Sequence, residues 1–269
     1  MPYTTLNGIR VHYETYGSGD PVLLISGLGG PAVGWLFQVR DLSPRHHVIT
    51  FDNRGVGETD LPHDLMYSTG DMAEDARALL DHLDVQRAHV VGASMGGTIA
   101  MELAIRHPER VQSLVLCCTW AEGDGRFLRA IESWRALLPQ LSFEDRLRHV
   151  LFPWLYSPAF LADSARVADG VKRALAYPFP TRGEAFERQG RGLIEWNGTR
   201  LRELAKLETP ALVLVGRDDI LTPPTFSRRL AALLPNGRLK TLPGGHGFFI
   251  EEAERVNRAI LAFLASVKN

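Results

Sequence analysis

Apolar segments that alternate with helical segments run through most of this chain, and this pattern constrains the fold more than any other feature. β-Strands are predicted from the apolar runs at residues 21–25, 46–51, 88–93, 111–118, 209–216 and 237–242, and each run ends in glycines or polar residues. Helices are predicted at 71–83, 95–107, 224–235 and 247–267, where apolar residues recur with helical spacing. Strands that alternate with helices indicate a mostly parallel sheet that is covered on both faces.

Two segments depart from the alternation. Residues 3–17 form two β-rich runs joined by Asn7-Gly8, which predicts a hairpin that adds antiparallel strands at one edge of the sheet. Residues 120–200 are rich in aromatic residues and prolines, and the strand pattern resumes only near residue 210. We interpret 120–200 as a helical cap on a core formed by 1–119 and 201–269. The alternative is a separate small domain with its own core.

The start of the helix at 71–83 is predicted from its acidic residues. Asp71 suits the N-cap position and Glu74 suits N3, as in a capping box.

Composition argues against several classes of partner. The formal net charge is −1, so no strong field points to nucleic acid or to an anionic membrane. No window of about 18 apolar residues predicts a membrane span, and the N-terminus lacks the features of a signal peptide. The adjacent Cys117 and Cys118 lie in an apolar run and are interpreted as buried thiols, with a redox pair as the alternative. We therefore expect a cytoplasmic protein.

The segment Gly92-Ala93-Ser94-Met95-Gly96 has the form G-x-S-x-G, with a predicted strand before it and a predicted helix after it. This context is typical of a nucleophile elbow, in which small flanking residues permit a sharp turn. The motif alone is weak evidence, because a serine in a glycine-rich turn can have no chemical role.

A nucleophilic serine needs a base and an acid that orients the base. Asp218 and Asp219 follow the strand at 209–216, and His246 follows the next strand. His246 is the only histidine after this pair of aspartates. The carboxyl ends of parallel strands meet at one edge of a sheet, so Ser94, an aspartate and His246 are expected to converge there. A role of His246 in capping the last helix is the alternative.

These motifs together resemble the α/β-hydrolase superfamily over the whole chain. The resemblance rests on "SGLGG" (26–30), "DNRGVGETD" (52–60), "GASMGG" (92–97), "GRDDILTPP" (216–224) and "GGHGFFIEEAERVN" (244–257). It implies an eight-stranded, mostly parallel sheet with the cap inserted after the sixth strand. It also selects Asp219 over Asp218 as the acid, and it implies that the loop at 52–60 braces the site.

The resemblance further implies an oxyanion hole made by the backbone N–H groups of Leu28 and Met95. Relatives commonly carry histidine where this chain has Ser26. The hydrogen bonds that support the 26–30 loop must therefore differ from those in such relatives. Expected pocket residues are Gly27, Gly29, Trp120, Trp134, Trp154 and Phe248, although aromatic residues of the cap can equally form its core.

The expected function is hydrolysis of a small carboxylic ester or lactone through an acyl-enzyme, without a cofactor or metal. Serine at the elbow disfavours dehalogenase and epoxide hydrolase chemistry. The motifs resemble those of 3-oxoadipate enol-lactonases, carboxylesterases and aminoacrylate or carbamate hydrolases. Alternatives are a carbon–carbon bond hydrolase, a cofactor-free perhydrolase and a non-catalytic small-molecule receptor. The sequence specifies neither the substrate nor the oligomeric state.

Overall fold

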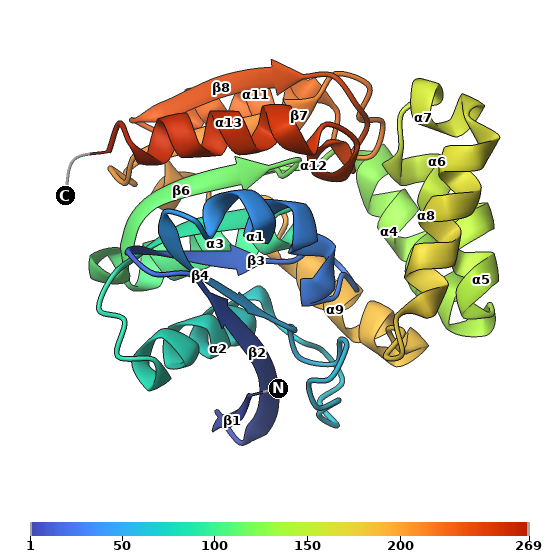
Figure 1. Cartoon of the computed structure of the whole chain (residues 1–269), viewed down its shortest axis with the longest axis horizontal. Coiled ribbons are helices and arrows are strands. Elements are labelled where there is room, and N and C mark those ends of the chain that lie inside the picture. The colour runs from blue at the N-terminus through green and yellow to red at the C-terminus, as the bar shows by residue number, and fades with distance from the viewer. Residues whose placement is uncertain (1, 268–269) are drawn as a thin grey trace.

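A computed structural model describes residues 2–267 as an eight-stranded sheet with helices on both faces (Figure 1). The strand order is β1-β2-β4-β3-β5-β6-β7-β8, and all neighbours from β4 to β8 pair in parallel. The strands are β1 (Tyr3–Leu6), β2 (Ile9–Tyr16), β3 (Asp20–Ile25), β4 (His46–Phe51), β5 (Ala88–Ala93), β6 (Val111–Cys117), β7 (Ala211–Gly216) and β8 (Gly237–Leu242). The predicted fold class is confirmed.

The predicted hairpin at the edge of the sheet is also confirmed. β1 pairs with β2, and β2 pairs with β4, both antiparallel. Asn7 and Gly8 connect β1 to β2 with φ angles of 48° and 80°. Two successive residues with positive φ match the twist of the flanking strands, which explains why Asn-Gly stands here.

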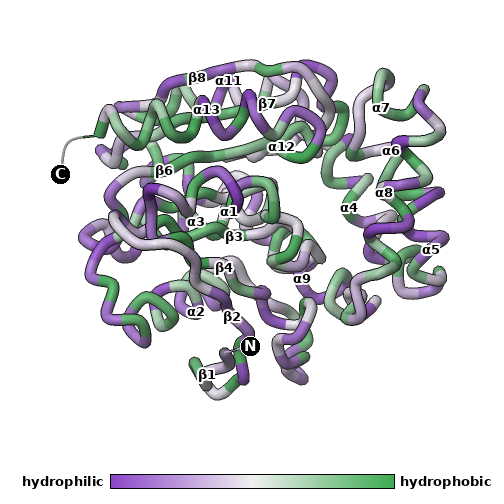
Figure 2. The backbone as a smooth tube through the Cα atoms, viewed as in Figure 1, coloured by the Kyte–Doolittle hydropathy of each residue, from purple (hydrophilic) through white to green (hydrophobic). Residues whose placement is uncertain are grey.

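Two layers of helices cover the sheet. Helices α1 (Leu36–Leu42) and α13 (Ala253–Leu264) cover one face, and α2 (Thr69–His82), α3 (Met95–Arg106) and α11 (Pro224–Leu233) cover the other. Neighbouring residues of β3 alternate between these layers, since Leu23 packs with α2 and α3 and Leu24 with α1 and α13. In Figure 2 the central strand β6 is largely hydrophobic, whereas α13 alternates in hydropathy, as a helix with one buried face should.

A helical insertion separates β6 from β7. We use this term for residues 120–200. Its helices are α4 (Gly125–Leu137), α5 (Phe143–Asp145), α6 (Phe152–Leu155), α7 (Pro158–Ala162), α8 (Ser164–Ala176) and α9 (Gly183–Trp196), with a π-helical segment at Arg146–Leu151. The short helix α10 (Leu201–Leu204) leads back to the sheet, and α12 (Phe248–Glu251) precedes α13. Helices α4 to α8 lie beyond the end of the sheet toward which β6 and β8 point (Figure 1).

The insertion has two parts that differ in packing. Phe127 and Trp134 of α4 and Phe186 and Trp196 of α9 belong to the same hydrophobic cluster as α2 and α3. The outer helices instead share a small cluster of Leu147, Phe152, Phe160 and Val171. The inner helices are therefore continuous with the main core, and the outer helices have a core of their own.

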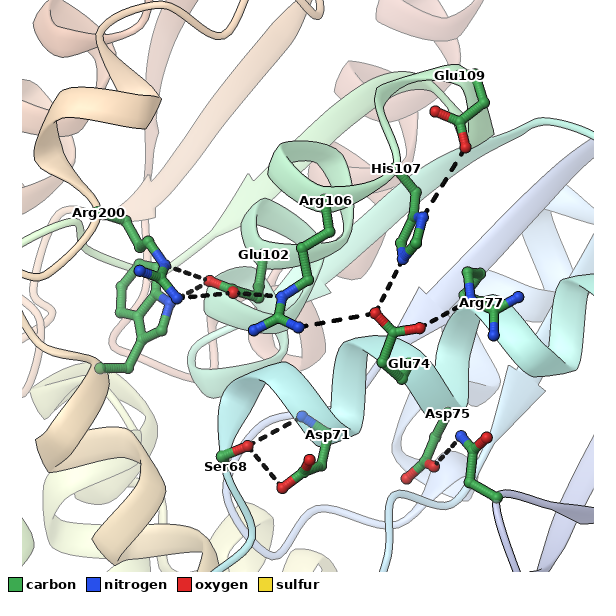
Figure 3. Close-up of polar contacts among 12 residues, drawn as sticks. Ser68, Asp71, Glu74, Asp75, Arg77, Glu102, Arg106, His107, Glu109 and Arg200 are labelled. Atoms are coloured by element: carbon green, nitrogen blue, oxygen red, sulfur yellow. Dashed lines mark hydrogen bonds and ion pairs between the residues drawn. The ribbon is translucent and has the colours of Figure 1, made fainter.

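The prediction of Asp71 as an N-cap was wrong. Helix α2 begins at Thr69 with Ser68 as its N-cap, and the Ser68 hydroxyl accepts a hydrogen bond from the Asp71 N–H at 3.0 Å. Asp71 therefore occupies N3, and its carboxylate accepts a hydrogen bond from the Ser68 hydroxyl (Figure 3). The Ser68 hydroxyl oxygen thus accepts a hydrogen bond from a free N–H group at the helix N-terminus. Asp71, three residues later, accepts a hydrogen bond from the same hydroxyl.

Candidate active site

Ser94 lies in the sharp turn between β5 and α3, in a backbone conformation that non-glycine residues rarely adopt. Its φ is 55° and its ψ is −121°. Three hydrogen bonds hold this conformation: the Ser94 N–H donates to Cys117 O at 2.8 Å, and Ser94 O accepts from the Thr119 hydroxyl at 2.8 Å and from the Gly97 N–H at 2.9 Å. Strain of this kind costs about 1–3 kcal/mol and persists where the surroundings enforce it.

Three glycines surround Ser94, and at each of them a neighbouring atom occupies the space that a Cβ atom would need. A Cβ on Gly92 would lie 2.2 Å from Gly96 O, and one on Gly96 would lie 2.1 Å from Ile25 O. A Cβ on Gly97 would lie 2.6 Å from the Thr119 Cβ. Gly92 and Gly96 thus allow the turn, while Gly97 allows α3 to pack closely on the segment after β6.

Asp219 and His246 form a buried pair after β7 and β8. His246 Nδ1 lies 2.9 Å from Asp219 Oδ2, and the other carboxylate oxygen accepts the N–H groups of Leu221 and Thr222 at 2.9 and 2.8 Å. Asp218 is exposed, and its backbone N–H donates to Gly244 O. Of the two aspartates, Asp219 is therefore the one that contacts the histidine.

Thr222 is a further polar residue of the site that the sequence did not reveal. Its hydroxyl donates to Asp219 Oδ2 at 2.8 Å, and it lies 3.0 Å from His246 Nδ1. The same oxygen lies 2.9 Å from Cys118 O, which ties the turn after β7 to the segment after β6. The available signal was its spacing, since a hydroxyl three residues after an aspartate commonly joins that aspartate in a turn.

Ser94 follows β5 and the Asp219–His246 pair follows β7 and β8, with β6 between them. The segment at Cys117–Thr119, which begins at the last residue of β6, bonds to Ser94 on one side and to Thr222 on the other. Within residues 2–267, no hydrogen bond joins the Ser94 hydroxyl to His246. Contacts between a nucleophile and its base are often loose until substrate binds.

The loop at Ser26–Gly30 lies beside Ser94, because a Cβ on Gly27 would be 3.1 Å from the Ser94 Cβ. Asn53 and Asp52, which follow β4, brace it. The Asn53 amide donates to Ser26 O at 3.0 Å, and Asp52 Oδ1 accepts the Ala32 N–H at 2.7 Å. These contacts show how the loop is supported without a histidine at position 26.

Two backbone N–H groups near Ser94 have no acceptor among the described residues. One is that of Leu28, in the turn whose ends are joined by a hydrogen bond from the Gly30 N–H to Gly27 O at 3.0 Å. The other is that of Met95, the first residue of α3, where an N–H has no partner within the helix. A helix N-terminus with a free N–H favours negative charge.

The predicted pocket residues occupy different environments. Trp154 lines a cleft of about 180 Å³ beside Asp219, together with Asp124, Arg126, Phe127, Ile220, Leu221 and Pro223. Trp134 is buried and packs edge-on against Trp154. Trp120 and Phe248 are fully buried in the two hydrophobic cores. Gly29 lies under the ring of Phe186. As substrate-pocket residues, all members of this set remain predictions.

Other features bear on compartment and ligands. Cys117 and Cys118 are free and buried, and burial raises the pKa of the Cys117 thiol to about 12 and that of Cys118 well above its usual value. Residues 2–267 hold no cluster of three or more His, Cys, Asp or Glu side chains suited to a metal ion. In the same part of the chain, no helix is both long and apolar enough to cross a membrane.

Comparison with known proteins places these features in a family. Residues 20–253 match the family model of the alpha/beta hydrolase fold. The chain is 39% identical to a Variovorax paradoxus protein named "Putative carbamate hydrolase RutD", over 96% of this chain and 97% of that protein.

Two solved structures are similar over nearly their full length. "Putative non-heme bromoperoxidase BpoC" of Mycobacterium tuberculosis has a TM-score of 0.84 at 34% identity, covering 96% of this chain and 97% of its own. The enol-lactonase of Burkholderia xenovorans has a TM-score of 0.84 at 25% identity, covering 98% and 100%. Fold and site thus define an α/β hydrolytic enzyme with a serine at the carboxyl edge of its sheet. The chain belongs to the α/β-hydrolase family.

Proposed function

We propose that this protein is a serine hydrolase that cleaves a small carboxylic ester or lactone through an acyl-enzyme. The observation that carries the proposal is the strained, glycine-flanked Ser94 on the same sheet edge as the hydrogen-bonded Asp219–His246 pair. A serine hydroxyl is a weak nucleophile at neutral pH, and such a pair is what activates it. The name of the similar enol-lactonase supports a cyclic ester as substrate.

In the proposed mechanism, His246 takes the proton of Ser94 as the oxygen attacks the carbonyl carbon. Asp219 holds the imidazole through Nδ1 and stabilises the imidazolium. The free N–H groups of Leu28 and Met95 donate hydrogen bonds to the developing oxyanion, a contribution that is typically worth about 10²- to 10³-fold in rate for each donor. His246 then protonates the leaving oxygen and later activates the water that releases the acyl group.

The helical insertion acts in this proposal as a cap over the site. The contacts of Gln189 and Thr181 of the insertion with Gly29, in the loop beside Ser94, support this role. The two buried, free cysteines support a reducing compartment, and we propose the cytoplasm.

Carbamate hydrolysis is the second candidate, because the 39% identical relative carries that activity in its name. A carbamate presents the same kind of electrophilic carbonyl, so the same serine, histidine and N–H groups would serve. The two candidates differ in the leaving group and in the substrate that the pocket prefers, and not in the catalytic residues.

The test compares matched 4-nitrophenyl esters and carbamates, together with a panel of lactones, by kcat/KM. We expect turnover of at least one class, labelling of Ser94 by a fluorophosphonate, and a loss of about 10⁴-fold or more in kcat for Ser94→Ala. Ser266→Ala, which changes an exposed serine at the end of α13, is the matched control and should behave as wild type. A protein that neither turns over these substrates nor reacts with the fluorophosphonate would contradict the proposal and favour a receptor on the same fold.

A further inference from the structure

Both backbone groups of Gly29, in the turn that presents the Leu28 N–H, are bonded to side chains of the helical insertion. The Gly29 N–H donates to Gln189 Oε1 at 2.9 Å, and Gly29 O accepts the Thr181 hydroxyl at 2.6 Å. Both side chains belong to buried residues, with Gln189 fully buried and Thr181 4% exposed. A buried polar group that loses its hydrogen-bond partner lowers the free energy of unfolding, so contacts of this kind hold the groups that they join in place.

Gln189 is itself fixed from a second side. Its Nε2 group donates to Arg54 O at 3.1 Å, in the loop that follows β4. Since this nitrogen has a carbonyl acceptor, the amide oxygen is the end that faces the Gly29 N–H. One glutamine of α9 therefore joins two loops of the sheet edge.

Thr181 is also fixed by a second hydrogen bond. Its carbonyl accepts a hydrogen bond from Arg146 Nη1 at 2.8 Å, and Arg146 Nε donates to Leu141 O at 3.0 Å. The Arg146 guanidinium lies 5.9 Å from the ring of Phe186, and that ring lies over Gly29, where a Cβ would approach it to 2.2 Å. The Thr181 backbone is thus hydrogen-bonded to Arg146, while its hydroxyl reaches Gly29.

These contacts complete the restraint of the turn at Gly27–Gly30. The peptide plane that carries the Leu28 N–H also carries Gly27 O, which accepts the Gly30 N–H at 3.0 Å. Gly29 has a positive φ of 64°, and glycine backbone is the most free to rotate. The Asn53 amide holds Ser26 O on one side of this peptide plane, and the partners of Gly29 hold the chain on its other side, so together they fix the direction in which the Leu28 N–H points.

We propose that Gln189 and Thr181 are positioning residues for the oxyanion hole, so that the helical insertion builds part of the catalytic site as well as covering it. This inference rests on the proposed function for its catalytic consequence. An oxyanion donor contributes mainly in the transition state, so a misaligned Leu28 N–H should lower kcat far more than it raises KM.

The test uses a pair of variants at one position. Thr181→Val removes the hydroxyl at nearly constant volume, and Thr181→Ser keeps it. Thr199→Val is the control, since the Thr199 hydroxyl donates to Trp196 O at 2.7 Å in the same insertion but away from the 26–30 loop. The readouts are kcat, KM, inhibition by a trifluoromethyl ketone that forms a tetrahedral adduct with the serine, and amide hydrogen exchange of residues 26–31.

For Thr181→Val we expect kcat to fall by about 10- to 100-fold with KM changed by less than about 3-fold. Affinity for the trifluoromethyl ketone should fall in parallel with kcat, and exchange at residues 26–31 should become faster. Thr181→Ser should restore all four readouts, and Thr199→Val should leave them unchanged. Gln189→Met, a near-isosteric change that removes both hydrogen bonds, should give the same pattern as Thr181→Val.

Several results would overturn the proposal: unchanged kcat in Thr181→Val, a loss expressed in KM alone, or a serine variant as impaired as the valine variant. Thermal unfolding of each variant distinguishes these effects from failure to fold. If Thr181→Val does not fold, the proposal is judged on Thr181→Ser. A wild-type enzyme without Ser94-dependent turnover would contradict the proposed function instead. In that case the exchange of residues 26–31 still decides whether Thr181 and Gln189 fix the loop.

Discussion

Single residues of this protein show how burial sets their chemistry. His89 lies in the middle of the sheet on β5 and is 2% exposed. Its Nδ1 lies 2.7 Å from the Ser113 hydroxyl of the neighbouring strand. Burial lowers the pKa of His89 to about 4, and nearby His46 adds to this effect. The imidazole is therefore neutral in the folded protein at pH values where an exposed histidine carries charge.

The stability of the protein should therefore fall in mild acid. Because the pKa of His89 is lower in the folded than in the unfolded chain, its contribution is complete above about pH 6.5 and is lost as the pH falls toward 4. Between pH 8 and pH 5 we expect a loss of about 2 kcal/mol in the free energy of unfolding from this residue. Urea unfolding at the two pH values measures it.

The matched variants are His89→Gln, which cannot titrate, and His63→Gln, which changes an exposed histidine. The first should remove this part of the acid dependence and the second should not. If the wild-type protein and His89→Gln lost stability equally, the assignment to His89 would be wrong.

At the scale of elements, one buried carboxylate connects the sheet helices to the end of the insertion. Glu102 of α3 is 1% exposed and accepts hydrogen bonds from Arg106 at 2.6 Å, from the Trp196 indole at 2.9 Å and from Arg200 at 2.9 and 3.1 Å (Figure 3). Burial favours its protonated form, but these hydrogen bonds outweigh burial and lower the pKa of Glu102. The carboxylate thus remains charged and fastens the chain where α9 ends.

Replacement of Glu102 by glutamine should be destabilising. The change removes the shared partner of two partly exposed arginines and leaves the Trp196 indole without its carboxylate acceptor, and we expect it to cost about 1–3 kcal/mol. Glu132→Gln is the control, since it breaks an exposed pair with Arg129 and should cost less than about 1 kcal/mol. Urea unfolding at pH 7 compares the two, and equal effects would show that Glu102 has no special role.

At the scale of the whole molecule, the insertion joins the core unevenly. Helices α4 and α9 pack into the main hydrophobic cluster, and the outer helices share a cluster of four buried residues. The outer part contacts the segment that follows β8, near His246: the Gly247 N–H donates to Leu155 O at 2.6 Å, and Ser157 bonds to Glu251. Partly buried residues such as Trp154 also pack against the main cluster. Few buried apolar contacts imply a low free energy of local opening.

Amide hydrogen exchange followed by mass spectrometry should therefore separate the two parts of the insertion. We expect α8 to exchange through local opening well before α9, which should exchange only at the rate of the main core. Exchange of α8 and α9 at one common rate would contradict this prediction and indicate that the insertion opens as a unit.

Much of the sheet and of the helices that cover it could be predicted from the amino-acid sequence. Apolar periodicity identified the central strands and the sheet helices α2, α3, α11 and α13, because each buries one face or both in a continuous core. It did not identify the short helix α1. Ser94 was readable because the turn after β5 tolerates only glycine at positions 92 and 96. The start of α2 was misplaced by local reasoning, because both Ser68 and Asp71 can cap a helix and only the backbone path distinguishes them.

The chain's own residues thus specified the fold class, the serine turn and the strand ends that carry the aspartate pair and His246, because these depend on local patterns and on a regular topology. The choice of Asp219 over Asp218 came from the family resemblance. Thr222 beside His246, and Gln189 and Thr181 on Gly29, came only from the packed structure. Gln189 and Gly29 are 160 positions apart. A hydrogen bond over that separation leaves no periodicity or motif in the sequence, since it exists only once the insertion has packed on the edge of the sheet.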